Sequence, residues 1–151
     1  MEAGPRLRGL LHMVTAPLAA VGGIALILVA EPRSYQIGLA LFTGTSVLLF
    51  AVSAAYHRGH WSPDVERRLR RLDHSNIFLI IAGTYTPLTI ALLESDAARS
   101  LLTAIWSAAA LGVLVHNVWP TAPRFVSAFL YVLRGGLAGF DLPEFRSAGW
   151  L

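Results

Sequence analysis

Long apolar runs, separated by short polar or charged segments, follow one another along most of this chain. A helix needs about 20 mainly apolar residues to cross the hydrocarbon core of a bilayer. Four runs reach that length, and they cover residues 9–30, 35–56, 74–93 and 101–119. A fifth run, over residues 125–142, contains Arg134 and Asp141, and a central charge opposes insertion by about 2.5–3.5 kcal/mol. The pattern predicts an all-α, polytopic transmembrane helical bundle, a single membrane domain over residues 1–151 with four spans and a candidate fifth.

The bulk composition indicates that lipid is the solvent of this chain. Hydrophobic residues make up 55% of it and charged residues 14%, with a mean hydropathy of +0.58. This is more apolar surface than a soluble domain of 151 residues can bury, so membrane lipids are expected partners. A secretory signal is an alternative for the first run because Arg6 and Arg8 precede it, but the run is too long and lacks a cleavage site. The absence of cysteine excludes disulfides and thiolate metal sites.

The positive charges indicate how the spans are oriented. All 12 basic residues are arginines, and the net charge is +3. Because successive connections lie on opposite sides of the membrane, the arginines divide between two sides. One side has those of the amino terminus, of the second-to-third connection and Arg124, whereas the other has only Arg33 and Arg99. Arginines concentrate on the cytoplasmic side, so we expect the amino terminus in the cytoplasm and no nucleic-acid partner.

The connection after the second run has a helical pattern of its own. Ser62 can cap a helix, Pro63 suits its first position and Asp64 suits its positive end. We expect a short interfacial helix over about residues 62–72, with its arginines toward anionic headgroups. A solvated segment that only sets topology, with no partner, is an equally open interpretation.

Polar residues interrupt the apolar runs near one end of the predicted bundle. Ser53 and His57 lie four residues apart on one helical face at the end of the second run, and Asp73 precedes the third. Successive spans run in opposite directions, which brings these ends to the same, cytoplasmic side. Ionisable residues inside membrane spans are costly and usually face a functional interior. His57 and Asp73 are therefore the first candidates for a site.

The remaining histidines have simpler interpretations. His12 and His116 lie within a turn of their span ends, where an imidazole reaches headgroups or water at little cost. His60 belongs to the connection beyond the second span and is expected to be exposed. His74 follows Asp73 directly, so the two side chains diverge by about 100° on a helix, and only one of them can face a shared site.

Three motifs together resemble the signature of the hemolysin III family, within the progestin and adipoQ receptor superfamily. They are SAAYH at residues 53–57, RLDHSNI at 71–77 and AGTYTP at 82–87. The segment RGLLH at residues 8–12 is similar to the start of the family's first span, and residues 99–106 are similar to its fourth. The resemblance covers nearly the whole chain, and the spacing of S-x-x-x-H and L-D-H makes it specific.

The resemblance implies a seven-span bundle in a bacterial-type plasma membrane and, in the receptor branch, a zinc ion near the cytoplasmic side. The metal ligands would be a histidine matching His57 and two histidines of an H-x-x-x-H pair on the last span. Asp73 would contact metal-bound water, and Ser53 would stabilise an oxyanion rather than act as a nucleophile. A zinc with three protein ligands and one open position can activate water to hydrolyse a lipid amide.

The chain departs from the family pattern because it stops after the region matching the fifth span and contains no H-x-x-x-H. We therefore expect a truncated member without that ligand pair, although His12, His74 and His116 lie in the right layer to replace it. Three functions stay open: part of a zinc-dependent membrane hydrolase, a membrane-permeabilising, haemolysin-like cytolytic protein, and a catalytically inert fragment. Self-association or a complementing membrane partner would supply the missing spans.

Overall fold

Four long α-helices make up the part of the chain that the computed structural model describes, residues 3–118. They are α1 (Ala3–Val29), α2 (Arg33–Arg58), α3 (Pro63–Leu92) and α4 (Ser95–Val118). Side chains are described from Gly9 onward. Residues 3–118 contain no strand, so the all-α class predicted from the sequence is confirmed. The candidate fifth span, residues 125–142, lies outside the described residues.

All four helices are long and apolar enough to cross a membrane. The shortest of these segments, Gly9–Val29, has 21 residues, or about 32 Å at 1.5 Å per residue, against a hydrocarbon core of about 30 Å. Large apolar side chains point outward: Leu28 is 77% exposed and Val118 75%. Such surface is unfavourable in water and suited to lipid. The chain is therefore an integral, polytopic membrane protein.

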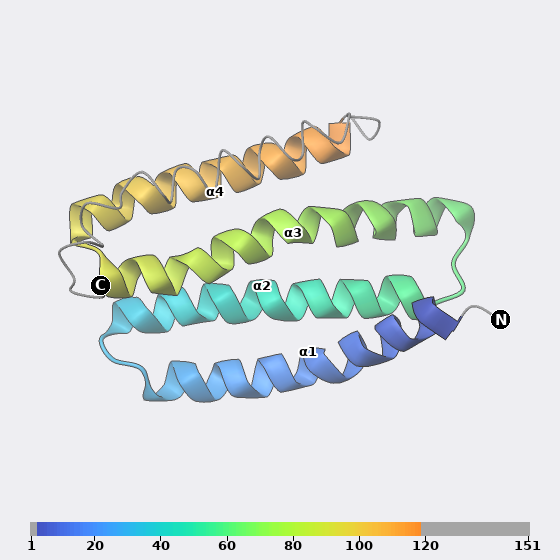
Figure 1. The fold of residues 1–151 in the computed structure, drawn as a ribbon, viewed down its shortest axis with the longest axis horizontal. Helices are drawn as coiled ribbons and strands as arrows, with labels where there is room; N and C mark the ends of the chain where they lie inside the picture. The colour runs from blue at the N-terminus through green and yellow to red at the C-terminus, as the bar shows by residue number, and fades with distance from the viewer. Residues whose placement is uncertain (1–2, 119–151) are drawn as a thin grey trace.

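The helices lie side by side in one layer, each antiparallel to the one before it (Figure 1). Among the described residues, α1 packs on α2, α2 on α3 and α3 on α4, and no other pair of helices is in contact. Connections of two to four residues join them, and short connections make neighbours antiparallel. The start of α1, the connection between α2 and α3 and the end of α4 consequently meet at one end of the layer, on the right in Figure 1.

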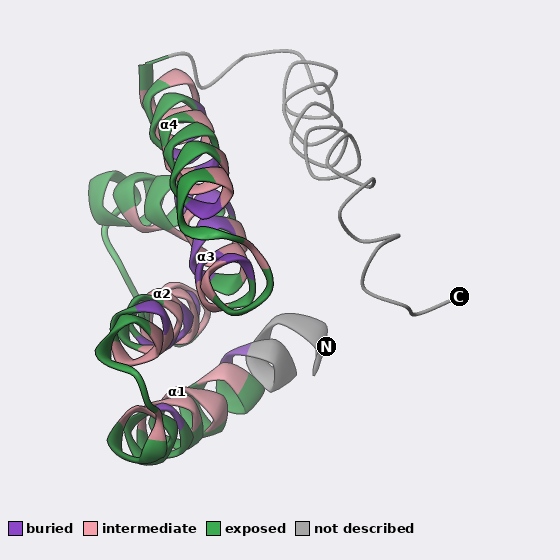
Figure 2. Ribbon diagram, turned by 90° about the vertical axis from the view of Figure 1, so that its left-hand side faces the viewer, coloured by how far each residue is buried: buried purple, intermediate pink, exposed green. Residues whose placement is uncertain are grey.

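Small and hydroxyl-bearing side chains are buried between neighbouring helices. The buried polar residues are Thr43, Ser46, Ser53, Ser75, Asn76, Thr86 and Thr89. Most of the buried positions of the ribbon face an adjacent helix, whereas the outer faces are exposed (Figure 2). Lipid tails are as apolar as leucine, so membrane helices associate through close packing and hydrogen bonds rather than through the hydrophobic effect. This distribution agrees with a lipid solvent.

Glycines allow the helices to approach one another closely. A Cβ atom added at Gly83 of α3 would overlap Thr45 of α2, and one added at Gly112 of α4 would lie 2.5 Å from the ring of Phe78. Close backbone approach at small residues is the usual way in which membrane helices gain contact area. The apolar core between α3 and α4 consists of Phe78, Ala82, Ile105 and Ala109.

Helix α3 is one continuous helix of 30 residues. The separate interfacial helix expected over about residues 62–72 is instead its first part, because residues 64–82 contain no glycine or proline to interrupt the backbone hydrogen bonds. Ser62 occupies the N-cap position and Pro63 the first turn, as predicted, but the Ser62 side chain makes no capping bond. At about 45 Å, α3 exceeds the hydrocarbon thickness, which leaves its charged first turns outside.

Candidate functional site

The three predicted site residues lie at the same end of the layer. Ser53 is buried, with 4% of its surface exposed, and His57 is half-buried one turn nearer the end of α2. The two side chains share a face of α2 because four residues make about one helical turn. Asp73 is half-buried on α3, which begins at this same end (Figure 1).

Helix α1 packs against the turn of α2 that carries His57. A Cβ atom added at Gly9 would lie 3.1 Å from Cβ of His57 and 2.8 Å from Cγ of Arg58, so the missing side chain of Gly9 permits this approach. The ring of His57 also lies near that of Tyr56, with centroids 4.7 Å apart. His57 is therefore packed by α1 and Tyr56 rather than extended freely from the helix end.

His12 lies about one turn beyond Gly9 on α1 and enters the same interface. The centroid of its ring is 5.6 Å from that of Phe50 on α2. Its Nδ1 atom is buried and has no hydrogen-bond partner within residues 3–118, an arrangement that costs about 1–3 kcal/mol. The sequence favoured a ring that reaches headgroups or water. The structure instead places one nitrogen of this ring inside the contact between α1 and α2.

Helix α3 turns a polar side toward α2. Asn76 Nδ2 donates a hydrogen bond to the carbonyl oxygen of Leu48 at 3.4 Å. Asp73 precedes Asn76 by about one turn, and the helices are antiparallel, so the same register carries Asp73 beyond Leu48 toward the turn with Ser53. Asp73 thus lies at about the depth of Ser53, whereas His57 packs against α1.

The carboxylate of Asp73 has no ionic partner in the described part of the chain. The ion pairs within residues 3–118 join Arg67 to Asp64 and Arg99 to Asp96. A half-buried carboxylate that makes no ion pair is available as a hydrogen-bond acceptor or as a ligand. Asp73 could take part in a polar site only if its carboxylate is available in this way.

The described residues do not form a complete zinc site. Within residues 3–118, no three His, Cys, Asp or Glu side chains are placed so that they could hold one metal ion, and the sequence contains neither cysteine nor H-x-x-x-H. Zinc sites in proteins use three or four protein ligands. His57 and Asp73 therefore match only part of the ligand environment that the resemblance implies.

His74 and His116 form a separate cluster between α3 and α4. Their rings stack, with centroids 5.7 Å apart and planes 14° apart. His74 Nδ1 donates a hydrogen bond to the carbonyl oxygen of Arg70 at 2.7 Å. His74 thus faces α4, and the side chain of Asp73, the preceding residue, leaves the helix about 100° away from it. Neither ring of this cluster joins His57 in a metal-binding group among the described residues.

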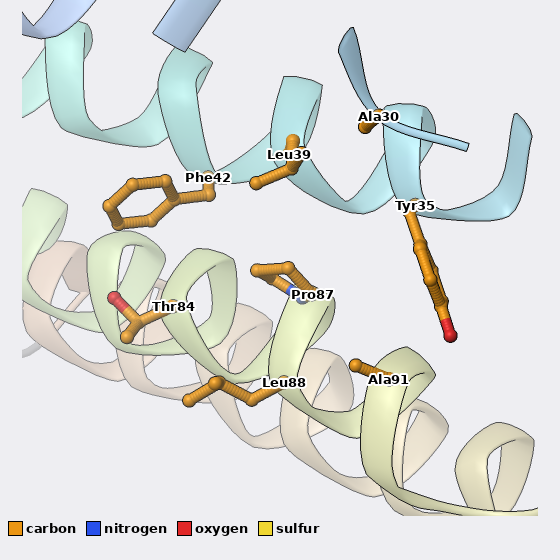
Figure 3. Close-up of a pocket in the computed structure, with 8 residues that line it drawn as sticks. All are labelled: Ala30, Tyr35, Leu39, Phe42, Thr84, Pro87, Leu88 and Ala91. Carbon is orange, nitrogen blue, oxygen red and sulfur yellow. The ribbon is translucent and has the colours of Figure 1, made fainter. Parts of the chain in front are cut away.

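An apolar hollow between α2 and α3 lies at the opposite end of the layer (Figure 3). Its volume is about 420 Å³, and its lining includes Leu39, Phe42, Pro87 and Leu88. Among the described residues, no histidine and no carboxylate line it. The hollow is therefore not a second location for the predicted chemistry.

Comparison with known proteins places the chain in a family. Residues 3–149 match the family model described as "Haemolysin-III related". The chain belongs to the hemolysin III family. Hemolysin-3 of Bacillus cereus is 34% identical over 131 residues, which are 83% of this chain and 58% of that protein. The Hemolysin-3 homolog of Bacillus subtilis (strain 168) is 34% identical over 96 residues, 62% of this chain and 44% of that protein.

This hemolysin III family chain spans about half the length of the curated relatives that it matches. No solved structure matches it. Its family motifs lie where helices meet: SAAYH ends α2 beside α1, and RLDHSNI runs through α3 between α2 and α4.

Two features of the site end were missed by sequence reasoning. They are the stack of His74 on His116 and the buried nitrogen of His12. Helical spacing predicts which residues share a face of one helix, but it does not say which faces of different helices meet. A signal was present for His12, because it lies three residues after Gly9, and a glycine on a membrane helix favours a close interhelical contact.

Proposed function

We propose that this hemolysin III family member contributes one wall of a metal-dependent membrane hydrolase site at the arginine-rich end of its helices. The observation that carries the proposal is the gathering of polar groups there. Ser53 is buried and His57 half-buried on one face of α2, and Asp73 lies on α3 at the same end. Polar and ionisable groups inside membrane spans are costly, and their concentration at one depth is typical of a site.

His57 is the metal ligand in this proposal. A neutral imidazole is a common zinc ligand, and the packing of this ring against α1 and Tyr56 reduces the conformational freedom that it would lose on binding. Asp73 would orient water, and Ser53 would donate a hydrogen bond to a substrate oxygen. The reaction class expected of the completed site is zinc-dependent hydrolysis of a lipid amide. No step of that reaction is assigned to residues 3–118 alone.

The other metal ligands come from outside residues 3–118 or from another copy of the chain in this proposal. Helices α1 and α4 each have a single neighbour among the described helices, so further spans can pack against either. The partner in this proposal is a second copy of the chain, so the purified protein alone supplies every ligand.

The proposed site faces the cytoplasm. The arginines at the site end include Arg58, Arg67, Arg68, Arg70 and Arg71, and Arg6 and Arg8 occur in the sequence at the start of α1. At the opposite end of the described helices, only Arg33 and Arg99 occur. An excess of arginine in short connections favours the cytoplasmic side, and the amino terminus lies at the same end of the layer as this excess (Figure 1).

The zinc content of the detergent-purified protein tests the proposal. The parent chain, His57→Ala and His60→Ala are equilibrated with zinc, separated from free metal and analysed for zinc per chain. His60 is exposed in the connection after α2, so its variant controls for the loss of an imidazole. The proposal predicts zinc in the parent and in His60→Ala and its loss in His57→Ala. A parent without zinc, or an unchanged zinc content in His57→Ala, would contradict it.

Membrane permeabilisation is the second candidate function. The two relatives are named Hemolysin-3 and Hemolysin-3 homolog. A single layer of helices with buried polar side chains can line a pore once several layers associate. This function predicts dye leakage from vesicles that persists in His57→Ala. Vesicles that stay sealed at high protein load would exclude it. A chain that neither binds zinc nor releases dye would fit the third possibility, a catalytically inert fragment.

A further inference from the structure

A cavity whose lining, within residues 3–118, consists of basic side chains lies where α3 and α4 meet at the site end. Its volume is about 270 Å³, and it is lined by Arg67, Arg70, Arg71 and His74 of α3 and by His116 of α4. Arg70, Arg71 and His74 follow Arg67 by three, four and seven residues, so the four side chains form one stripe along α3. His116 of α4 lies opposite this stripe, so the cavity exists because α3 packs against α4.

The positive charge of this cavity is only partly neutralised. Arg67 pairs with Asp64. Among residues 3–118, neither Arg70 nor Arg71 takes part in an ion pair. Adjacent guanidinium groups repel one another, and an anion held between them would relieve this repulsion. The electrostatics therefore favour an anionic ligand.

The two histidines give the cavity a defined wall. The rings of His74 and His116 stack nearly parallel, with centroids 5.7 Å apart. The hydrogen bond from His74 Nδ1 to the carbonyl oxygen of Arg70, 2.7 Å long, holds the His74 ring against its own helix. The wall is thus set by contacts inside the protein, while Arg70 and Arg71, which make no ion pair within residues 3–118, can adjust to a ligand.

From this arrangement we propose that the cavity binds a phosphate group and that the phosphate belongs to an anionic membrane lipid. A guanidinium group matches phosphate geometry because it can donate two parallel hydrogen bonds to two oxygens. The volume of about 270 Å³ equals that of about nine waters at ~30 Å³ each. This space accommodates a phosphate group with part of its hydration.

The depth of the cavity identifies a lipid as the source of the phosphate. Residues 63–72 of α3 include six charged residues, so this part of the helix lies outside the hydrocarbon. Trp61, just before it, is 43% exposed, and tryptophan is enriched at the membrane interface. The cavity therefore lies at the level of the headgroups, where arginine clusters attract anionic lipids. Ser53, His57 and Asp73 do not line it, so this proposal is independent of the metal site.

Native mass spectrometry of the full chain in detergent tests this proposal with two lipids. Dioleoyl phosphatidic acid carries the phosphate, and dioleoylglycerol has the same acyl chains without it. Arg71→Gln removes a cavity arginine, whereas the matched control Arg68→Gln removes the same charge from an exposed position that does not line the cavity. We expect the parent and Arg68→Gln to bind phosphatidic acid in preference to dioleoylglycerol, and Arg71→Gln to bind it about tenfold more weakly.

A parallel titration with inorganic phosphate separates the two sources of the group. Binding of phosphatidic acid that inorganic phosphate displaces, and that only Arg71→Gln weakens, supports a lipid phosphate in this cavity. Binding of inorganic phosphate without binding of the lipid would overturn the lipid assignment. Equal losses in Arg68→Gln and Arg71→Gln, or equal binding of dioleoylglycerol, would overturn the site itself. His57→Ala is expected to bind phosphatidic acid like the parent, so failure of the metal site and failure of this one are distinguishable.

Discussion

Replacing Gly112 by alanine tests how α4 packs on α3. The added Cβ atom would lie 2.5, 2.6 and 2.9 Å from three ring carbons of Phe78, Cδ1, Cε1 and Cγ. Phe78 is only 6% exposed and belongs to the apolar core with Ala82, Ile105 and Ala109. The ring has little space into which it can move, so the two helices must separate or the ring must leave its preferred rotamer.

The magnitude follows from two opposing effects. Overpacking of a filled interface costs about 1–3 kcal/mol, whereas alanine in place of glycine in a helix gains about 0.8–1.0 kcal/mol. Gly44 of α2 is a matched control because a Cβ atom added there meets nothing within 4 Å. Both variants receive the helical gain, so their difference isolates the packing cost. Gly112→Ala should be less stable than Gly44→Ala by about 1–3 kcal/mol.

The free energy of unfolding of each variant can be measured in mixed micelles. The fraction of sodium dodecyl sulfate is increased over a mild detergent, and helix content is followed by circular dichroism. Gly44→Ala should unfold at the same or a higher fraction of dodecyl sulfate than the parent, and Gly112→Ala at a lower one. Equal free energies of unfolding for the two variants would refute the packing of Gly112 against Phe78.

Two further predictions concern orientation and hydrogen bonding. The chain has no cysteine, so a single introduced cysteine reports the side of the membrane on which it lies. A membrane-impermeant maleimide added to intact cells should label Ser34→Cys, and it should label His60→Cys only after lysis. The opposite result would contradict the proposed orientation. Trp106→Phe removes the hydrogen bond from Nε1 to Thr86 Oγ1, 3.1 Å long, and should lower the free energy of unfolding by about 0.5–1.5 kcal/mol. Trp61→Phe removes an exposed hydrogen bond, from Trp61 Nε1 to the carbonyl oxygen of Ala55, and should lower the free energy of unfolding less. Equal effects of the two variants would contradict a stabilising role for the bond to Thr86.

Hydropathy predicted the existence and order of the four helices but not their bounds. The first run begins at residue 9, whereas α1 begins at Ala3, and the fourth begins at residue 101, whereas α4 begins at Ser95. The length of an apolar run indicates only the part of a helix that lies inside the hydrocarbon core of the membrane. Backbone hydrogen bonding continues beyond that part to the connection, and α1 and α3 continue past Pro17 and Pro87. For the same reason, the interfacial helix expected over about residues 62–72 is continuous with the rest of α3.

The site was predictable within each helix and not between helices. The shared face of Ser53 and His57 and the divergence of Asp73 from His74 follow from 3.6 residues per turn. The buried Nδ1 of His12 depends on how α1 crosses α2, which is decided by contacts such as that of Gly9 with His57. Such pairings are set by side-chain shapes on both helices, and the periodicity of a single helix contains no information on them.

The proposed metal site depends above all on His57 as a ligand at the end of α2. Cobalt(II) in place of zinc reports this directly, because four-coordinate cobalt with nitrogen ligands absorbs visible light much more strongly than the hydrated ion. We expect a strong visible spectrum for the purified parent and for His60→Ala, and the loss of this spectrum in His57→Ala. The weak spectrum of hydrated cobalt in the parent, or the same strong spectrum in His57→Ala, would contradict it.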